Sequence, residues 1–78
     1  MRDEQGNNLY SIGKLEDIVR IPATVLRVYD EQGVLKPQIR DDETGYRYYM
    51  EEQVMKCKFI SELRRQGFTV ASIKALCE

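Results

Sequence analysis

The stretch "YSIGKLEDIVRIPATVLRVYDEQG", residues 10–33, decides the fold. Apolar residues recur at helical spacing in its first part, and Ser11 stands where a capping hydroxyl is expected. Pro22 cannot continue a helix from upstream, but it suits the first turn of a new one. The second helix runs to Gly33, a residue suited to a left-handed stop. Two short helices joined by a tight break are typical of a helix-turn-helix.

The next segment, "VLKPQIRDDETGYRYY" at residues 34–49, predicts a β-hairpin. Gly45 supplies the positive φ that the turn needs, and Pro37 confines the first strand to a sheet edge. Side chains alternate along a strand, so Arg47 and Tyr49 are expected to share one face. We expect the hairpin to project from the body as a wing and to expose Arg47.

Two further helices are predicted after the hairpin, at residues 51–66 and from Thr69 onward, with Gly67 between them. Their apolar faces are expected to hold Val54, Cys57, Ile60 and Leu63 in the first, and Ile73, Leu76 and Cys77 in the second. This order of elements predicts a mainly α fold: a winged helix-turn-helix with a β-hairpin wing and two further helices. Residues 1–8 are predicted to be a disordered lead-in, and residues 9–78 one domain.

Composition excludes several classes of function. The 78 residues carry a net charge of −1 and contain no histidine, so histidine-based catalysis is excluded. Cys57 and Cys77 alone cannot complete a four-ligand zinc shell. We interpret both as small core hydrophobes and expect neither a metal nor a cofactor, with metal or redox sensing as the alternative. The lack of a long apolar run predicts no membrane span and a cytoplasmic location.

Three pieces of sequence carry a resemblance to a known family: "LRVYDEQGVLKP" (residues 26–37), "TGYRYY" (residues 44–49) and "FISELRRQGFTVASIKAL" (residues 59–76). In this order and spacing, the chain from about residue 9 to residue 77 resembles the DNA-binding domain of MerR-type transcription regulators, most closely the multidrug-sensing branch. The resemblance implies a homodimer on double-stranded promoter DNA. Such a homodimer would distort an over-long spacer so that RNA polymerase can engage both promoter elements. The helix that joins such dimers and the effector domain would lie outside this chain.

The resemblance also implies a set of DNA-binding residues. The second helix would enter the major groove, while the wing and the third helix would contact the backbone. The residues that match are Thr24, Arg27, Tyr29, Arg40, Tyr46, Arg47 and Arg64. Tyr29 is expected to be part core and part phosphate contact, and Arg20 stands where the family usually has a turn glycine. Val28 lacks the hydroxyl of the aromatic residue that is usual at its position.

Three of the arginine assignments have a plainer alternative. Arg27 could be an exposed helix arginine that pairs with Asp30 or Glu31. Arg40 and Arg47 could pair within the wing, with the acidic run at residues 41–43. Such exposed pairs contribute about 0–1 kcal/mol, so they would not prevent a phosphate from competing.

Two alternatives to a promoter regulator stay open for the whole chain. One is a stand-alone, excisionase-like architectural protein that binds DNA. The other is a winged helix used only for protein contacts, which would be indifferent to duplex DNA. An enzyme is not expected, because the sequence shows no nucleophile with a base, no glycine-rich phosphate loop and no carboxylate pair in an evident cleft.

Overall fold

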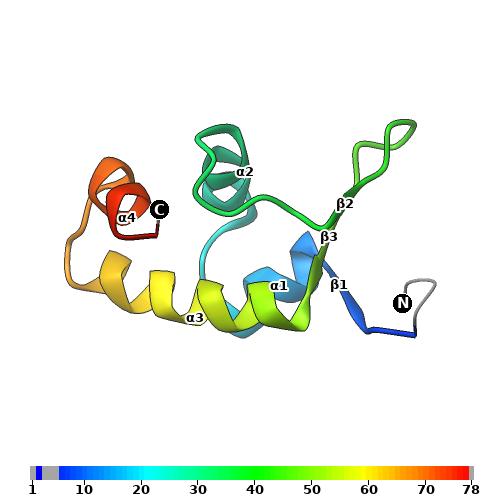
Figure 1. Cartoon of the computed structure of the whole chain (residues 1–78), viewed down its shortest axis with the longest axis horizontal. Coiled ribbons are helices and arrows are strands. Elements are labelled where there is room, and N and C mark those ends of the chain that lie inside the picture. Colours follow the sequence, from blue (N-terminus) through cyan, green and yellow to red (C-terminus); the bar gives the residue numbers. More distant parts are fainter. Residues whose placement is uncertain (1, 3–5, 78) are drawn as a thin grey trace.

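A computed structural model describes residue 2 and residues 6–77. Within these residues the chain forms four helices and one antiparallel three-stranded sheet. The elements are β1 (Leu9–Ser11), α1 (Ile12–Val19), α2 (Ala23–Glu31), β2 (Ile39–Arg40), β3 (Arg47–Met50), α3 (Glu51–Arg65) and α4 (Val70–Cys77). Figure 1 shows α3 running beneath α2, with the β2–β3 wing projecting beyond one end and α4 at the other.

The first two helices form the predicted helix-turn-helix. The Ser11 hydroxyl accepts a hydrogen bond from the Lys14 backbone N–H at 3.1 Å and so caps α1. Pro22 gives α2 no side-chain cap, and the Glu16 carboxylate accepts from the Ala23 N–H at 2.5 Å instead. Because Glu16 belongs to α1, this bond fixes the start of one helix against the other.

The wing is confirmed, and the sheet contains one strand more than the sequence predicted. The strand order is β1-β3-β2, which leaves β2 at an edge, and Gly45 has a φ of 76° in the wing turn. The unpredicted strand β1 places Tyr10 opposite Tyr49. At three residues it is too short to show an alternating pattern. Half of the predicted lead-in, residues 1 and 3–5, lies outside the described residues, and Arg2 pairs with Asn8 in an isolated bridge.

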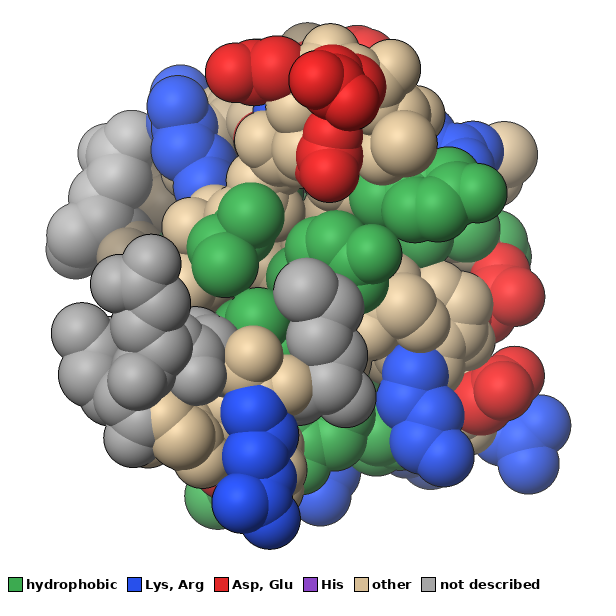
Figure 2. All heavy atoms as spheres, turned by 90° about the vertical axis from the view of Figure 1, so that its right-hand side faces the viewer, with side chains coloured by type: hydrophobic (Ala, Val, Ile, Leu, Met, Phe, Trp, Pro, Cys, Tyr) green, Lys and Arg blue, Asp and Glu red, His purple; other side chains and the backbone are tan. Residues whose placement is uncertain are grey.

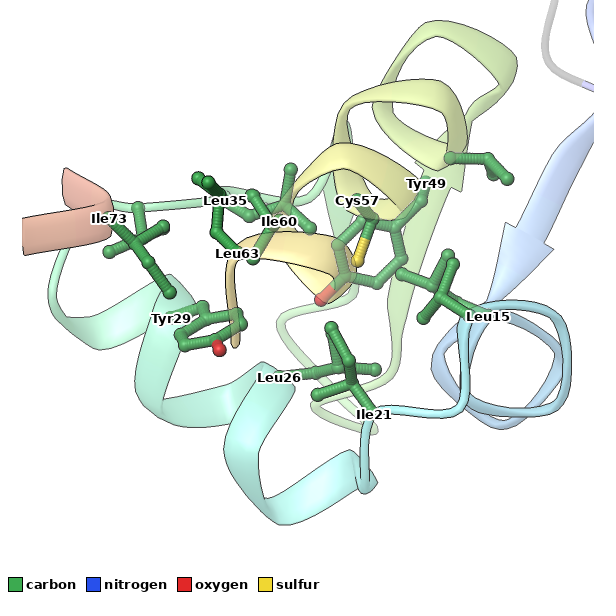
Figure 3. Close-up of a cluster of buried hydrophobic side chains, with 13 residues drawn as sticks. Leu15, Ile21, Leu26, Tyr29, Leu35, Tyr49, Cys57, Ile60, Leu63 and Ile73 are labelled. Atoms are coloured by element: carbon green, nitrogen blue, oxygen red, sulfur yellow. The ribbon is translucent and has the colours of Figure 1, made fainter. Parts of the chain in front are cut away.

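The core lies where α3 packs against the helix-turn-helix and β3. Figure 3 shows buried side chains from these elements pointing toward one another. The predicted buried face of α3 is confirmed, with Val54, Cys57, Ile60 and Leu63 all buried. Burial raises the pKa of the Cys57 thiol to about 12, so this cysteine is a neutral core side chain.

The prediction for α4 is only partly right. Ile73 is buried and Cys77 packs against the core, but Leu76 is 56% exposed. Neighbouring residues in a helix point about 100° apart. Leu76 therefore points away from the stripe formed by Val70, Ile73 and its neighbour Cys77. No helix within residues 6–77 is long and apolar enough to cross a membrane.

Candidate nucleic-acid interface

The outward face of α2 carries polar side chains with no ion pair to the residues that the structure describes. Thr24 and Arg27 are exposed, while Leu26 and Tyr29 face the core. Arg27 forms no ion pair with any residue that the structure describes, so the alternative of pairing with Asp30 or Glu31 is not realised. The guanidinium of Arg27 is therefore available to an external ligand.

Arg47 differs from its prediction. Its Nε donates to Oδ2 of Asp30 at 2.8 Å, and the two side chains are only 10% and 11% exposed. The expected exposure of Arg47 is wrong, and so is the alternative of a partner within the acidic run. The reason is strand alternation: β3 turns Arg47 to the same side as the buried Tyr49, toward the body, where Asp30 lies near the end of α2.

The outer part of the wing is exposed and locally ordered. Tyr46 is 64% exposed, and Arg40 is exposed on the edge strand. The Asp41 carboxylate accepts hydrogen bonds from the backbone N–H groups of Thr44 at 3.0 Å and Glu43 at 2.9 Å. These bonds lower the pKa of Asp41. Acidic side chains gather at the wing end of the molecule (Figure 2, top), where Asp41 holds the turn together.

A basic cleft lies between the α1–α2 turn and α3. Its lining includes Arg20, Lys58, Arg64 and Arg65, with Ile18, Val19 and Ser61. The Ser61 hydroxyl donates to the Val19 carbonyl at 2.9 Å, which ties α3 to the end of α1. Arg65 pairs with Glu62 at 2.9 Å on the surface, whereas Arg20, Lys58 and Arg64 form no ion pair with the described residues.

Arg20 is the feature of the cleft that sequence reasoning missed. The sequence identified it only as a substitute for a turn glycine, and the structure gives it a φ of 61°, in the left-handed region that favours glycine. The fold then brings it beside Lys58 and Arg64, which are far away in sequence. An arginine in a tight turn was therefore a visible signal in the sequence. Its closeness to Lys58 and Arg64 could not be predicted, because it depends on tertiary packing.

Two tyrosines are buried in the core. Tyr29 is 1% exposed, and its pKa is raised by burial, an effect that the charge of Arg64 opposes. The core half of its prediction is confirmed, and a phosphate contact would require its hydroxyl to move outward. Tyr49 is fully buried, and its hydroxyl has no hydrogen-bond partner among the described residues. Burial, reinforced by the charge of Asp30, raises the pKa of Tyr49 to about 12.

Solved structures of regulators share this fold. The structure of HiNmlR, described as a MerR family regulator lacking the sensor domain and bound to promoter DNA, matches with a TM-score of 0.71 at 27% identity. The match covers 90% of this chain and 55% of that one. A MerR-family regulator from Bacillus cereus matches with a TM-score of 0.75 at 23% identity, over 88% of this chain and 51% of that one, which supports the fold alone.

Curated relatives come from more than one branch. ZntR of Escherichia coli K12 is 32% identical over 68 residues, and the multidrug-efflux transporter 1 regulator of Bacillus subtilis is 32% identical over 65 residues. These matches cover 87% and 83% of this chain but 48% and 23% of the relatives. The chain thus spans about half the length of ZntR, and the multidrug branch is one of several that are similar. The family profile described as MerR HTH family regulatory protein matches residues 10–78. The chain belongs to the MerR family of helix-turn-helix regulatory proteins.

Proposed function

We propose that this chain is the promoter-binding domain of a transcription regulator. The observation that carries the proposal is the outward face of α2, where Thr24 and Arg27 are exposed and Arg27 is unpaired among the described residues. An α-helix fits the major groove, where a forked guanidinium can hydrogen-bond guanine O6 and N7 or a phosphate. A threonine hydroxyl can contact either kind of group.

Contacts outside the major groove would come from the wing and from the basic cleft. Arg40 and Tyr46 are exposed on the wing, and Arg64 is exposed in the cleft. Contacts of this kind position a protein on the duplex, while base contacts specify the sequence. Arg47 stays a predicted contact, but a phosphate could reach only the part of its guanidinium that the pair with Asp30 leaves exposed.

The net charge of −1 does not oppose this proposal, because the charges are unevenly placed. The acidic run at residues 41–43 is confined to the wing tip, whereas Arg20, Lys58 and Arg64 gather in the basic cleft. Binding depends on the local field at the contact surface, and net charge governs non-specific attraction. We therefore expect weak non-specific binding together with stronger binding to a preferred site.

The whole protein would act as a homodimer in the cytoplasm. Family membership and the HiNmlR structure with promoter DNA support the DNA binding on which this proposal depends. Two copies on one duplex would place their α2 helices, as recognition helices, at paired half-sites. RNA polymerase could then respond to the distorted spacer. We expect no catalytic activity, since the relatives are named as regulators.

A mobility-shift titration tests the proposal. Wild-type chain, and a version joined as a dimer, would be titrated against the DNA upstream of the protein's own gene and against an unrelated duplex of equal length. We expect the upstream DNA to bind more tightly, and more so with the dimer. Arg27→Ala should remove most of that preference, while Lys56→Ala, which removes an exposed α3 cation outside the basic cleft, should keep it. Equal binding of the two duplexes by wild type would refute sequence-specific recognition.

A further inference from the structure

Helix α2, the proposed recognition helix, is joined to the wing by an ion pair with little exposure to solvent. Arg47 is the first residue of β3, and Asp30 is the next-to-last residue of α2. Their side chains meet at 2.8 Å and are 10% and 11% exposed. The two elements that this pair connects are those proposed to touch DNA. The ion pair therefore affects how α2 and the wing are placed relative to each other.

The surroundings make it costly to separate Arg47 from Asp30. Tyr49, two residues beyond Arg47, is fully buried, and its pKa responds to the charges of Asp30, Arg47 and Arg27. The Tyr49 hydroxyl itself has no hydrogen-bond partner in the described structure. A charge in such a place that loses its partner is poorly solvated, so the paired arrangement is strongly preferred.

Asp30 can affect DNA binding in two opposite ways. If it only competes with phosphate for Arg47, then removing its charge should free a guanidinium and strengthen binding. If it holds the wing at a fixed angle to α2, then removing its charge should weaken binding, although the protein becomes more positive. The low exposure of both side chains favours the second outcome.

We infer that Asp30 is a positioning residue for promoter binding: through Arg47 it fixes the wing relative to the recognition helix, so that both can contact one duplex together. This inference rests on the proposed function. Asp30 would then favour binding through geometry, although its negative charge by itself repels DNA. Pre-organised contacts of this kind raise affinity by lowering the ordering cost of binding.

The test compares two variants that change net charge equally. Asp30→Asn removes the charge at the ion pair, and Asp42→Asn removes a charge from the exposed wing tip. Affinity would be measured for the upstream duplex and for an unrelated duplex of equal length, at a temperature where melting curves show every variant folded. We expect Asp30→Asn to weaken upstream binding by on the order of tenfold. Asp42→Asn should leave that binding unchanged or slightly stronger, and both variants should change binding to the unrelated duplex alike.

The outcomes separate the inference from the proposed function. If Asp30→Asn binds the upstream duplex as tightly as Asp42→Asn, or more tightly, then Asp30 does not position the wing. If wild type fails to prefer the upstream duplex, the proposed function fails, and the inference fails with it.

A second variant covers the case in which Asp30→Asn does not fold. Arg47→Lys keeps the charge but loses the planar fork, so the pair holds the wing less rigidly. We expect weaker upstream binding with an unchanged dependence of affinity on salt. Wild-type affinity in a folded Arg47→Lys variant would overturn the inference.

Discussion

Two arginine-bearing regions of the molecule behave in opposite ways. At the wing base, Arg47 is held by Asp30 and is 10% exposed, whereas in the basic cleft Arg20 and Arg64 are exposed and unpaired among the described residues. Arg47 lies near the acidic run in sequence, yet its partner comes from another element. Packing, and not sequence neighbours, therefore decides whether a guanidinium supports the fold or remains open to phosphate.

Arg47→Ala should produce the largest effect. It leaves Asp30 as a poorly solvated charge without its partner, so we expect the free energy of unfolding to fall by about 3 kcal/mol. Urea denaturation followed by circular dichroism measures this change. Arg64→Ala is the matched control in the basic cleft, where an exposed side chain should change stability by less than about 0.5 kcal/mol. Equal losses in the two variants would erase the contrast between the regions.

Tyr49→Phe tests the core beneath the wing base. It removes a buried hydroxyl that lacks a partner among the described residues, so we expect the free energy of unfolding to rise by about 1 kcal/mol. The pKa of Tyr49 is raised from 10.0 to about 12 in the folded chain. Wild type should therefore lose stability as pH rises above about 10, where only the unfolded tyrosine ionises. Urea denaturation at pH 7 and pH 11 should show that Tyr49→Phe lacks this contribution. A less stable variant at pH 7 would mean that the hydroxyl has a partner.

Arg20→Gly examines the basic cleft. Relief of the left-handed conformation gains about 1 kcal/mol, and the greater freedom of glycine in the unfolded chain offsets part of it. We expect a net stabilisation of about 0.5 kcal/mol in urea denaturation. If Arg20 contacts phosphate, the same variant should lower the slope of log affinity against log salt by about 0.9. A stabilised variant with an unchanged slope would remove Arg20 from the proposed contact surface.

Asp41 should give the smallest effect, one confined to the wing tip. Backbone N–H groups lower the pKa of Asp41 below its ordinary value of 3.8. The bonds therefore stabilise the turn above that value and are lost as pH falls through the lower folded pKa. Amide exchange at Thr44 should quicken below about pH 4, while α3 amides should be unaffected by this group. Asp41→Ala, which removes the acceptor, should show fast exchange at Thr44 already at pH 7. Equal pH responses in wild type and variant would remove Asp41 from the turn.

The sequence predicted most of the fold because its signals were local. Ser11 caps α1, Gly45 turns the wing, and the helical spacing of Val54, Cys57 and Ile60 marks the buried face of α3. Strand β1 was missed because three residues carry no period and its partner β3 lies about 40 residues away. Leu76 was misplaced because apolar spacing alone did not show where the buried stripe of α4 is centred.

The candidate site was harder to predict, since its charges interact across elements. Exposure of Thr24 and Arg27 follows from the helical period of α2 alone. The partner of Arg47 does not, because Asp30 precedes it by 17 residues and only the packing of β3 against α2 brings them together. The basic cleft likewise depends on how α1 and α3 meet.

The central claim is that α2, the wing and the basic cleft bind duplex DNA. Amide and side-chain NMR shifts, followed while the upstream duplex is added, test it most directly. We expect the largest changes at Thr24, Arg27, Tyr46 and Arg64. The exposed side chains of Met55 and Phe59 on α3 should stay unchanged. Changes centred on Met55 and Phe59, with α2 unaffected, would contradict the account.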